Sequence, residues 1–159
     1  MSDEHSFLLQ RVQPAMVGLI DGSLSTLAPI FGIAIYTQKP HTAFVAGLAT
    51  AVGAGISMAF SEGLSDTGEL TGRGSPLVRG TITGVGTFIG GILHTLPFLI
   101  PEYRPAVLVA LAAIAVELLA LAWIRRRFFG TRFLSSLVSV TLGGVIIATI
   151  SAALGGAVR

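Results

Sequence analysis

Four side chains that can bind metal recur at helical spacing between residues 58 and 69. They are Met58, Glu62, Asp66 and Glu69, which follow one another at intervals of four, four and three positions. On one continuous helix these positions share a face, so we expect a line of ligands. Carboxylates bind divalent cations, and a thioether favours iron over magnesium or calcium. The pattern predicts a divalent-metal site; the alternative is a helix end entering water, with Met58 packed in the core.

A second acidic position, Asp21, is followed by Gly22, Ser23, Ser25 and Pro29. Because proline has no backbone N–H, the carbonyl of Ser25 loses its helical hydrogen bond. A carboxylate, two hydroxyls and a free carbonyl then lie within about two helical turns. This arrangement suits a cation held by a kinked helix. The alternative is an aspartate paired with a neighbouring helix beside a proline kink.

Two more ionisable residues, His94 and Glu117, stand among apolar neighbours. An ionised group at bilayer depth is costly unless it is paired, and such residues often mark ion paths. Glu117 could pair with His94, pair with a hydroxyl of another helix, or carry a proton. We interpret both residues as candidates for proton coupling. For His94 the alternative is a packed, hydrogen-bonded histidine without a functional role.

The elements that must hold these residues are indicated by where charge is missing. Only 11% of the 159 residues are charged, 52% are hydrophobic, and the mean hydropathy is +0.82. A soluble domain carries about 25% charged residues, so a soluble monomer is excluded. Four long segments contain no Asp, Glu, Lys or Arg, namely 22–38, 40–61, 80–101 and 133–158.

A helix that spans a bilayer needs roughly 20 mostly apolar residues. We therefore predict an all-α membrane protein with five transmembrane helices, at about 14–36, 43–65, 78–100, 105–124 and 133–157. Residues 1–13 would form a cytoplasmic N-terminal tail, and the connections leave no room for a separate cytoplasmic metal-binding domain. A β-barrel is excluded because residues 106–116 are apolar throughout, whereas barrel strands alternate.

The positive charges predict the orientation of this bundle, because cytoplasmic loops carry an excess of Lys and Arg. With the N-terminus inside, the cytoplasmic side holds Arg11, Arg73, Arg79, Arg125, Arg126, Arg127 and Arg132. The outer side then holds Lys39, Arg104 and Arg159. We expect a cytoplasmic N-terminus and an external C-terminus. The net charge of only +2 gives no reason to expect a nucleic-acid partner.

Twenty glycines and the absence of cysteine limit the remaining possibilities. Gly80 with Gly84, and Gly86 with Gly90, form two pairs at the spacing that lets membrane helices approach closely. Five helices of this size enclose little space, so we expect a homodimer with a site on its axis. No thiolate site can form, and no Gly-x-Ser-x-Gly or His-Glu-x-x-His motif suggests a hydrolase. We therefore expect neither an enzyme nor a resident cofactor.

Three segments resemble a known family. They are Leu-Ile-Asp-Gly at 19–22, Gly-Ile-Ser-Met-Ala-Phe-Ser-Glu-Gly-Leu-Ser at 55–65, and Leu-Pro-Phe-Leu-Ile at 96–100. In the vacuolar iron transporter family the matching features are an Asp-Gly signature, a Ser-Met-Ala-x-Gly-Glu-Tyr-Leu-Ser segment and a Leu-Pro-Phe end of the third span. The likeness covers about 14–157. It is greatest to the membrane half of bacterial ferritin-like (erythrin) iron exporters.

The resemblance implies a five-helix homodimer in a bacterial inner membrane that exports Fe²⁺, and often Mn²⁺, in exchange for protons. It implies a path between the first two spans of the dimer that uses Asp21, Met58 and Glu62. Metal binding displaces protons from such ligands, which would link the two fluxes. The rival hypotheses are a passive divalent-cation channel and a non-transporting metal-binding or assembly subunit for a ferritin-like partner.

Two departures from the family pattern affect these expectations. Ser61 replaces the motif glycine, and Gly63 replaces the motif tyrosine. The connection at about 66–77 is short and keeps only Asp66 and Glu69 as acidic residues, where plant-type members carry a long Glu- and Met-rich helical domain. We expect either a minimal transporter or one that receives metal from a ferritin-like partner.

Overall fold

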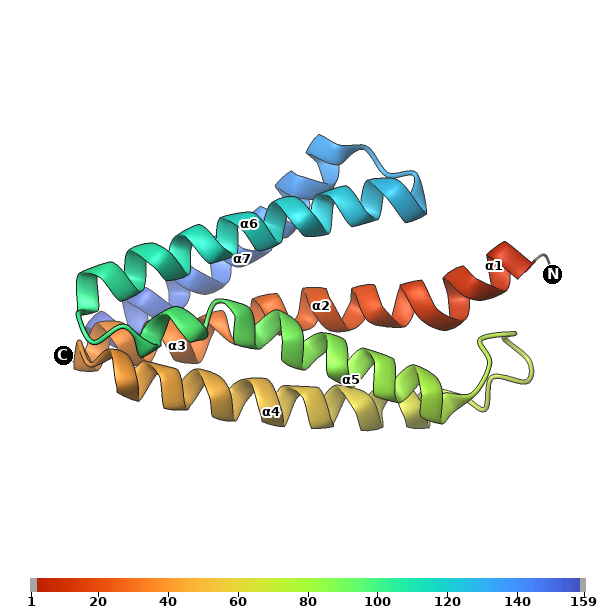
Figure 1. The fold of residues 1–159 in the computed structure, drawn as a ribbon, viewed down its shortest axis with the longest axis horizontal. Coiled ribbons are helices and arrows are strands. Elements are labelled where there is room, and N and C mark those ends of the chain that lie inside the picture. Colours follow the sequence, from red (N-terminus) through yellow and green to blue (C-terminus); the bar gives the residue numbers. More distant parts are fainter. Residues whose placement is uncertain (1–2, 158–159) are drawn as a thin grey trace.

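The computed structural model describes residues 3–157, which are helical almost throughout and contain no strand (Figure 1). The elements are α1 (Asp3–Phe7), η1 (Leu8–Val12, a π-helical turn), α2 (Gln13–Ser25), α3 (Leu27–Thr37), α4 (Pro40–Ser65), α5 (Pro76–Leu93), η2 (Leu96–Leu99, a 3₁₀ turn), α6 (Tyr103–Phe129) and α7 (Phe133–Ala157).

Five helical runs in this part of the chain are long and apolar enough to cross a membrane. The first comprises α1 through α3, and the other four are α4, α5, α6 and α7. The predicted all-α fold with five membrane-spanning helices is therefore confirmed. The run Asp3–Thr37 starts before the expected boundary near residue 14, because residues 3–13 are helical as well.

The third spanning helix is shorter than the expected 78–100. It ends at Leu93, and the chain then forms the 3₁₀ turn η2. Pro97 explains this end, because it has no N–H to donate to the carbonyl of Leu93. The fourth helix is longer than expected and continues to Phe129, where Gly130 adopts a positive φ of 63° and ends it.

The first spanning helix is interrupted at Thr26, between α2 and α3. The interruption lies three residues before Pro29, which cannot bond to the carbonyl of Ser25. The hydroxyl of Ser25 is also buried without a hydrogen-bond partner. The predicted irregularity after Asp21 and Gly22 is therefore present, with Thr26 at the junction.

Close backbone contacts hold α5 between α2 and α4. A Cβ atom on Gly22 of α2 would collide with the carbonyl of Thr87 on α5. On the other side of α5, a Cβ on Gly84 would lie 2.6 Å from the carbonyl of Gly55 on α4. Small residues permit this approach, which drives helix association in lipid through van der Waals contact. The fixed position of α5 in turn fixes His94 at its end.

The two ends of the molecule differ in how many arginines they hold. The start of the first helix, the 66–75 connection and the α6–α7 connection lie at one end, and α7 ends at the other (Figure 1). We call the first of these the arginine-rich end. It is the end of the described chain that holds Arg11, Arg73, Arg79, Arg125, Arg126, Arg127 and Arg132.

Candidate functional site

Two carboxylates and two arginines meet where α4 and α5 reach the arginine-rich end. Arg73 Nη2 lies 2.6 Å from Glu62 Oε1, and Arg73 Nη1 lies 3.1 Å from Asp66 Oδ2. Arg79 Nε lies 3.3 Å from Glu62 Oε1, and Arg79 Nη1 lies 3.1 Å from Asp66 Oδ1. We call these four residues the arginine–carboxylate cluster. Its formal charges balance, two positive against two negative.

The connection between the helices brings these side chains together. Asp66 is extended (φ −161°, ψ 162°), so the chain leaves the α4 axis directly after Ser65. Gly68, Gly72 and Gly74 all have positive φ, which lets the connection fold back tightly. Gln10 fastens this fold by donating from Nε2 to the carbonyl of Gly72 at 3.1 Å.

Arg79 has no exposed surface, whereas the side chains of Glu62 and Asp66 are 13% and 26% exposed. A buried guanidinium requires paired carboxylates, and Arg79 finds both of them here. Burial tends to raise the pKa of Asp66. Hydrogen bonds from Arg79, the Gly68 backbone and Thr71, together with the charge of Arg79, outweigh burial and hold that pKa below its usual value.

The expected line of four ligands on one continuous helix is wrong. Met58 and Glu62 share α4, where Met58 is half-buried, but the helix ends before Asp66. Asp66 turns back to the arginines, and Glu69 is exposed in the connection. No three His, Asp or Glu side chains in residues 3–157 are grouped so that they could hold one metal ion. Sequence analysis did not identify Arg73 and Arg79 as partners of these carboxylates, because no local spacing rule relates them to Glu62.

Asp21 lies on α2, apart from this cluster, and is half-buried. It takes part in none of the ion pairs formed within the described chain. The carboxylate is therefore not neutralised by an arginine, unlike Glu62. Of the predicted ligands within the spanning helices, Asp21 is the one whose oxygens are free of ion pairs.

The two residues predicted for proton coupling are in contact. His94 Nδ1 lies 3.0 Å from Glu117 Oε2 and 3.2 Å from Oε1, so pairing with His94 is the alternative that the structure selects. On the other side of the ring, His94 Nε2 lies 2.7 Å from Thr26 Oγ1, which donates to the carbonyl of Gly22 at 2.9 Å. We call Thr26, His94 and Glu117 the buried network.

The buried network joins three elements. Thr26 lies at the α2–α3 junction, His94 caps the end of α5, and Glu117 lies midway along α6. Thr26 and His94 have no exposed surface, and Glu117 is 8% exposed. Sequence reasoning missed Thr26. The sequence feature that could have identified Thr26 is its position, three residues before Pro29 in an apolar segment.

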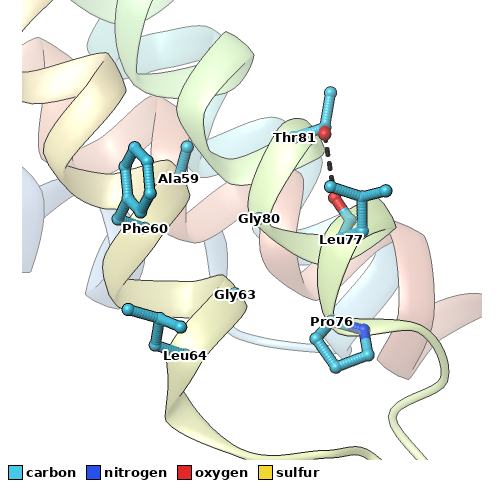
Figure 2. Close-up of a pocket in the computed structure, with 8 residues that line it drawn as sticks. All are labelled: Ala59, Phe60, Gly63, Leu64, Pro76, Leu77, Gly80 and Thr81. Atoms are coloured by element: carbon cyan, nitrogen blue, oxygen red, sulfur yellow. Dashed lines mark hydrogen bonds between the residues drawn. The ribbon is translucent and has the colours of Figure 1, made fainter.

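Two hollows lie near these groups but differ in character. A cavity of about 130 Å³ is bordered by Glu117 and Ser23, and most of its wall is apolar. A pocket of about 460 Å³ opens between the ends of α4 and α5 (Figure 2). The residues lining that pocket carry no ionisable group, and they are Ala59, Phe60, Gly63, Leu64, Pro76, Leu77, Gly80 and Thr81. Of these two hollows, the first is the one bordered by an ionisable side chain.

Comparison with known proteins yields a family match. The model of the VIT family, the vacuolar iron transporters, matches residues 12–71, which include Asp21, Met58 and Glu62. No curated protein and no solved structure matches the chain. The matched segment contains most of the first spanning run and all of the second in an all-helical, multi-pass membrane protein. Over residues 12–71 the chain is therefore similar to the VIT family.

Proposed function

We propose that this protein exports Fe²⁺, and also Mn²⁺, from the cytosol in exchange for protons. The VIT family indicates metal-ion transport across a membrane. The observation that carries the finer proposal is the extent of the match, because residues 12–71 hold the carboxylates and the thioether of the first two spans. A thioether beside carboxylates favours Fe²⁺ over Mg²⁺ or Ca²⁺, and Mn²⁺ also accepts carboxylate ligands.

The proposed path uses Asp21, Met58 and Glu62. Asp21 supplies carboxylate oxygens within the bilayer that no arginine occupies. Met58 lies one turn before Glu62 on α4, so a cation that enters from the Ser65 end of this face meets the carboxylate and then the sulfur. A homodimer would bring two copies of Asp21 to its axis and double the number of ligands without a further motif.

Metal would enter at the arginine-rich end, which we place in the cytoplasm because positive loops stay inside. There Asp66 and Glu69 would recruit the cation. Glu62 and Asp66 are bonded to arginines, so a divalent ion must displace a guanidinium to reach them. Arg73 is the one to move, because it lies in the connection and is 23% exposed, whereas Arg79 is fully buried.

Fe²⁺ flux into proteoliposomes, with a pH-sensitive dye in the lumen, tests this function. Asp21→Asn removes the charge that binds the cation while keeping the size of the side chain, so we expect metal flux to be lost and the dimer to persist. Asp3→Asn is the matched control, because Asp3 is an exposed aspartate outside the proposed path. The control should transport metal like the wild type.

The outcomes separate the rival functions. Metal entry with proton exit, lost in Asp21→Asn alone, supports the exchanger and its path. Metal entry without proton movement identifies a passive channel and overturns the exchange. An intact wild-type dimer that moves no metal overturns transport and favours a metal-binding or assembly subunit for a ferritin-like partner. Repeating the assay with Mn²⁺ tests the second substrate.

A further inference from the structure

We propose that Thr26, His94 and Glu117 form a proton-binding site that is separate from the metal ligands. The protonation state of this site determines whether Thr26 donates a hydrogen bond to the carbonyl of Gly22 in the first spanning helix. The inference deepens the proposed exchange, on which its role in transport rests. The existence of the site rests on hydrogen-bond geometry alone. It can therefore be tested without transport.

The hydrogen bonds fix where protons must lie. Thr26 has one hydroxyl hydrogen and donates it to the carbonyl of Gly22 at 2.9 Å. The oxygen therefore faces His94 Nε2, at 2.7 Å, with a lone pair, and Nε2 must be the donor. At 3.0 Å between His94 Nδ1 and Glu117 Oε2, one further proton must lie between nitrogen and carboxyl oxygen. The network thus holds one shared proton between histidine and glutamate.

Because the His94–Glu117 pair is buried, its stable state is the one that holds a single shared proton. With it, the pair is neutral overall, either as imidazolium with carboxylate or as imidazole with carboxylic acid. Losing the proton leaves one negative charge, and adding a second leaves one positive charge. His94 has no exposed surface and Glu117 is 8% exposed, so an uncompensated charge there is costly. The proton leaves when positive charge arrives nearby.

The elements packed around the network carry other titratable side chains. No titratable side chain occurs in η2 or α7. On the other elements packed around the network, the titratable residues are Asp21, Tyr36, His41, Glu62, Arg79, Tyr103, Arg104, Arg125, Arg126 and Arg127. Glu62 and Arg79 already neutralise each other at the arginine-rich end. Asp21 is the neighbour that matters, because it directly precedes Gly22, whose carbonyl accepts the Thr26 hydrogen bond.

Because Thr26 lies at the α2–α3 junction, a change in the protonation of His94 changes the hydrogen bonding of the helix backbone there. Once the shared proton has left, one hydrogen remains on the imidazole, and it binds the negative Glu117 best from Nδ1. That tautomer leaves Nε2 without a hydrogen, so the hydroxyl of Thr26 turns to donate to Nε2. The carbonyl of Gly22 then loses its bond from Thr26, in a helix already interrupted between α2 and α3. Protonation of the network and the backbone beside Asp21 are thereby linked, and a cation at Asp21 favours release of the shared proton.

The released proton leaves through Glu117. This side chain borders the cavity of about 130 Å³, together with the hydroxyl-bearing residues Ser23 and Thr141. A cavity of that size has room for several water molecules, each of which occupies about 30 Å³ in the liquid, and these three side chains offer them polar contacts in an otherwise mostly apolar wall. His94 does not border the cavity and lies behind Glu117. The path from ring nitrogen to carboxyl oxygen to cavity needs no other side chain.

The transport test compares Glu117→Gln with Glu102→Gln. Glutamine keeps the size of Glu117 but cannot take up the proton, so we expect metal entry without proton counter-movement and a loss of pH-driven accumulation. Glu102 is an exposed glutamate before α6 and serves as the control that keeps both. Full proton coupling in Glu117→Gln overturns the proposal. Asp21→Asn loses metal flux itself, so the two phenotypes are distinguishable.

A second measurement needs no transport and separates this proposal from the proposed function. In the purified full-length protein, ¹⁵N NMR of labelled histidine reports the protonation of both ring nitrogens of His94. We expect a proton on Nε2 and a titration that Glu117→Gln and Thr26→Val both shift, while Thr26→Ser shifts it less. A His94 signal without the Nε2 proton, or with the same titration in Glu117→Gln, overturns the site. The expected shifts in a wild type that moves no protons would support the site and overturn only the exchange.

Discussion

Arg79 is a full positive charge with no exposed surface, and its surroundings show what such a charge requires. Both of its partners are carboxylates, and Arg79 Nη2 also donates to the backbone carbonyl of Asp66 at 3.3 Å. Arg73 contacts the same two carboxylates but remains 23% exposed. The two arginines thus form chemically similar pairs in different dielectric surroundings, and their substitution should have different costs.

Arg79→Ala should destabilise the protein far more than Arg73→Ala. Breaking a buried ion pair by removing one partner costs roughly 3–5 kcal/mol, whereas partly exposed pairs contribute about 1 kcal/mol or less. Thermal unfolding of the detergent-solubilised variants, followed by size-exclusion chromatography, measures the difference. Equal losses in the two variants would show that Arg79 is not the central charge of the cluster.

The same pair gives a pH dependence with a defined sign. The folded protein holds the pKa of Asp66 below its usual value of 3.8, so the unfolded chain binds the proton more readily. The contribution of Asp66 is full above that value and disappears as the pH falls through the lower, folded pKa. The stability difference between wild type and Arg79→Ala should therefore shrink in acid. A difference that grows in acid would contradict this.

For both the arginine–carboxylate cluster and the buried network, the sequence predicted individual residues but not which residues they contact. Helical spacing identified Glu62 and Asp66, and isolation among apolar neighbours identified His94 and Glu117. It could not predict that Asp66 meets Arg79 thirteen positions later, because that contact depends on how the connection folds. The selection of His94 as partner of Glu117 likewise required the packing of α5 against its neighbours.

At the scale of elements, glycine decides where helices touch. A Cβ on Gly22 would meet backbone atoms of Thr87 and Gly91 on α5, and neither can move aside as a flexible side chain could. Gly53 on α4 is different, because nothing lies within 4 Å of the position where its Cβ would be. Both are helical glycines, so the pair isolates the effect of helix contact from that of helix propensity.

Gly22→Ala should destabilise the folded protein and also impair the buried network, since α2 must shift away from α5. Overpacking typically costs about 1–3 kcal/mol and more where backbone is displaced. Gly53→Ala should be neutral or stabilising by up to about 1 kcal/mol, because alanine is the better helix former. Thermal unfolding compares the two. Equal stability of both variants would show that the α2–α5 contact is looser than described.

The spanning helices could be predicted because charged side chains are costly within a bilayer, so spanning segments have few of them. Their ends could be predicted less well. Pro97 ended α5 early, and helical propensity in residues 3–13 extended the first run. The end of α4 at Ser65 was indicated in the sequence by the glycines that follow it, Gly68, Gly72 and Gly74. The regular spacing of acidic residues across that end gave the competing prediction of a continuing helix.

At the scale of the whole molecule, the two ends are unequal in positive charge. Seven arginines lie at the arginine-rich end, in the first helix, the connection 66–75, the start of α5 and the region around the α6–α7 connection. The opposite end of the described chain carries Lys39 and Arg104 as its Lys and Arg side chains. By the positive-inside rule this asymmetry orients the bundle in the membrane.

The chain has no cysteine, so single cysteines can report this orientation. Leu70, fully exposed in the connection 66–75, and His41, exposed at the start of α4, lie at opposite ends. In intact cells a membrane-impermeant maleimide should label His41→Cys and leave Leu70→Cys unlabelled until the membrane is permeabilised. The reverse pattern would place the arginine-rich end outside and overturn the proposed direction of export.

The glycine contacts of α5 also have an electrical consequence. Where backbones touch at Gly22 and Gly84, no width remains for a file of water molecules between the helices. A seam without water does not conduct small ions, because an ion there would lose its hydration without replacement. Both faces of α5 therefore act as insulation. A proton that moves between Glu117 and the far side of the membrane crosses part of this voltage, so its transfer depends on the membrane potential.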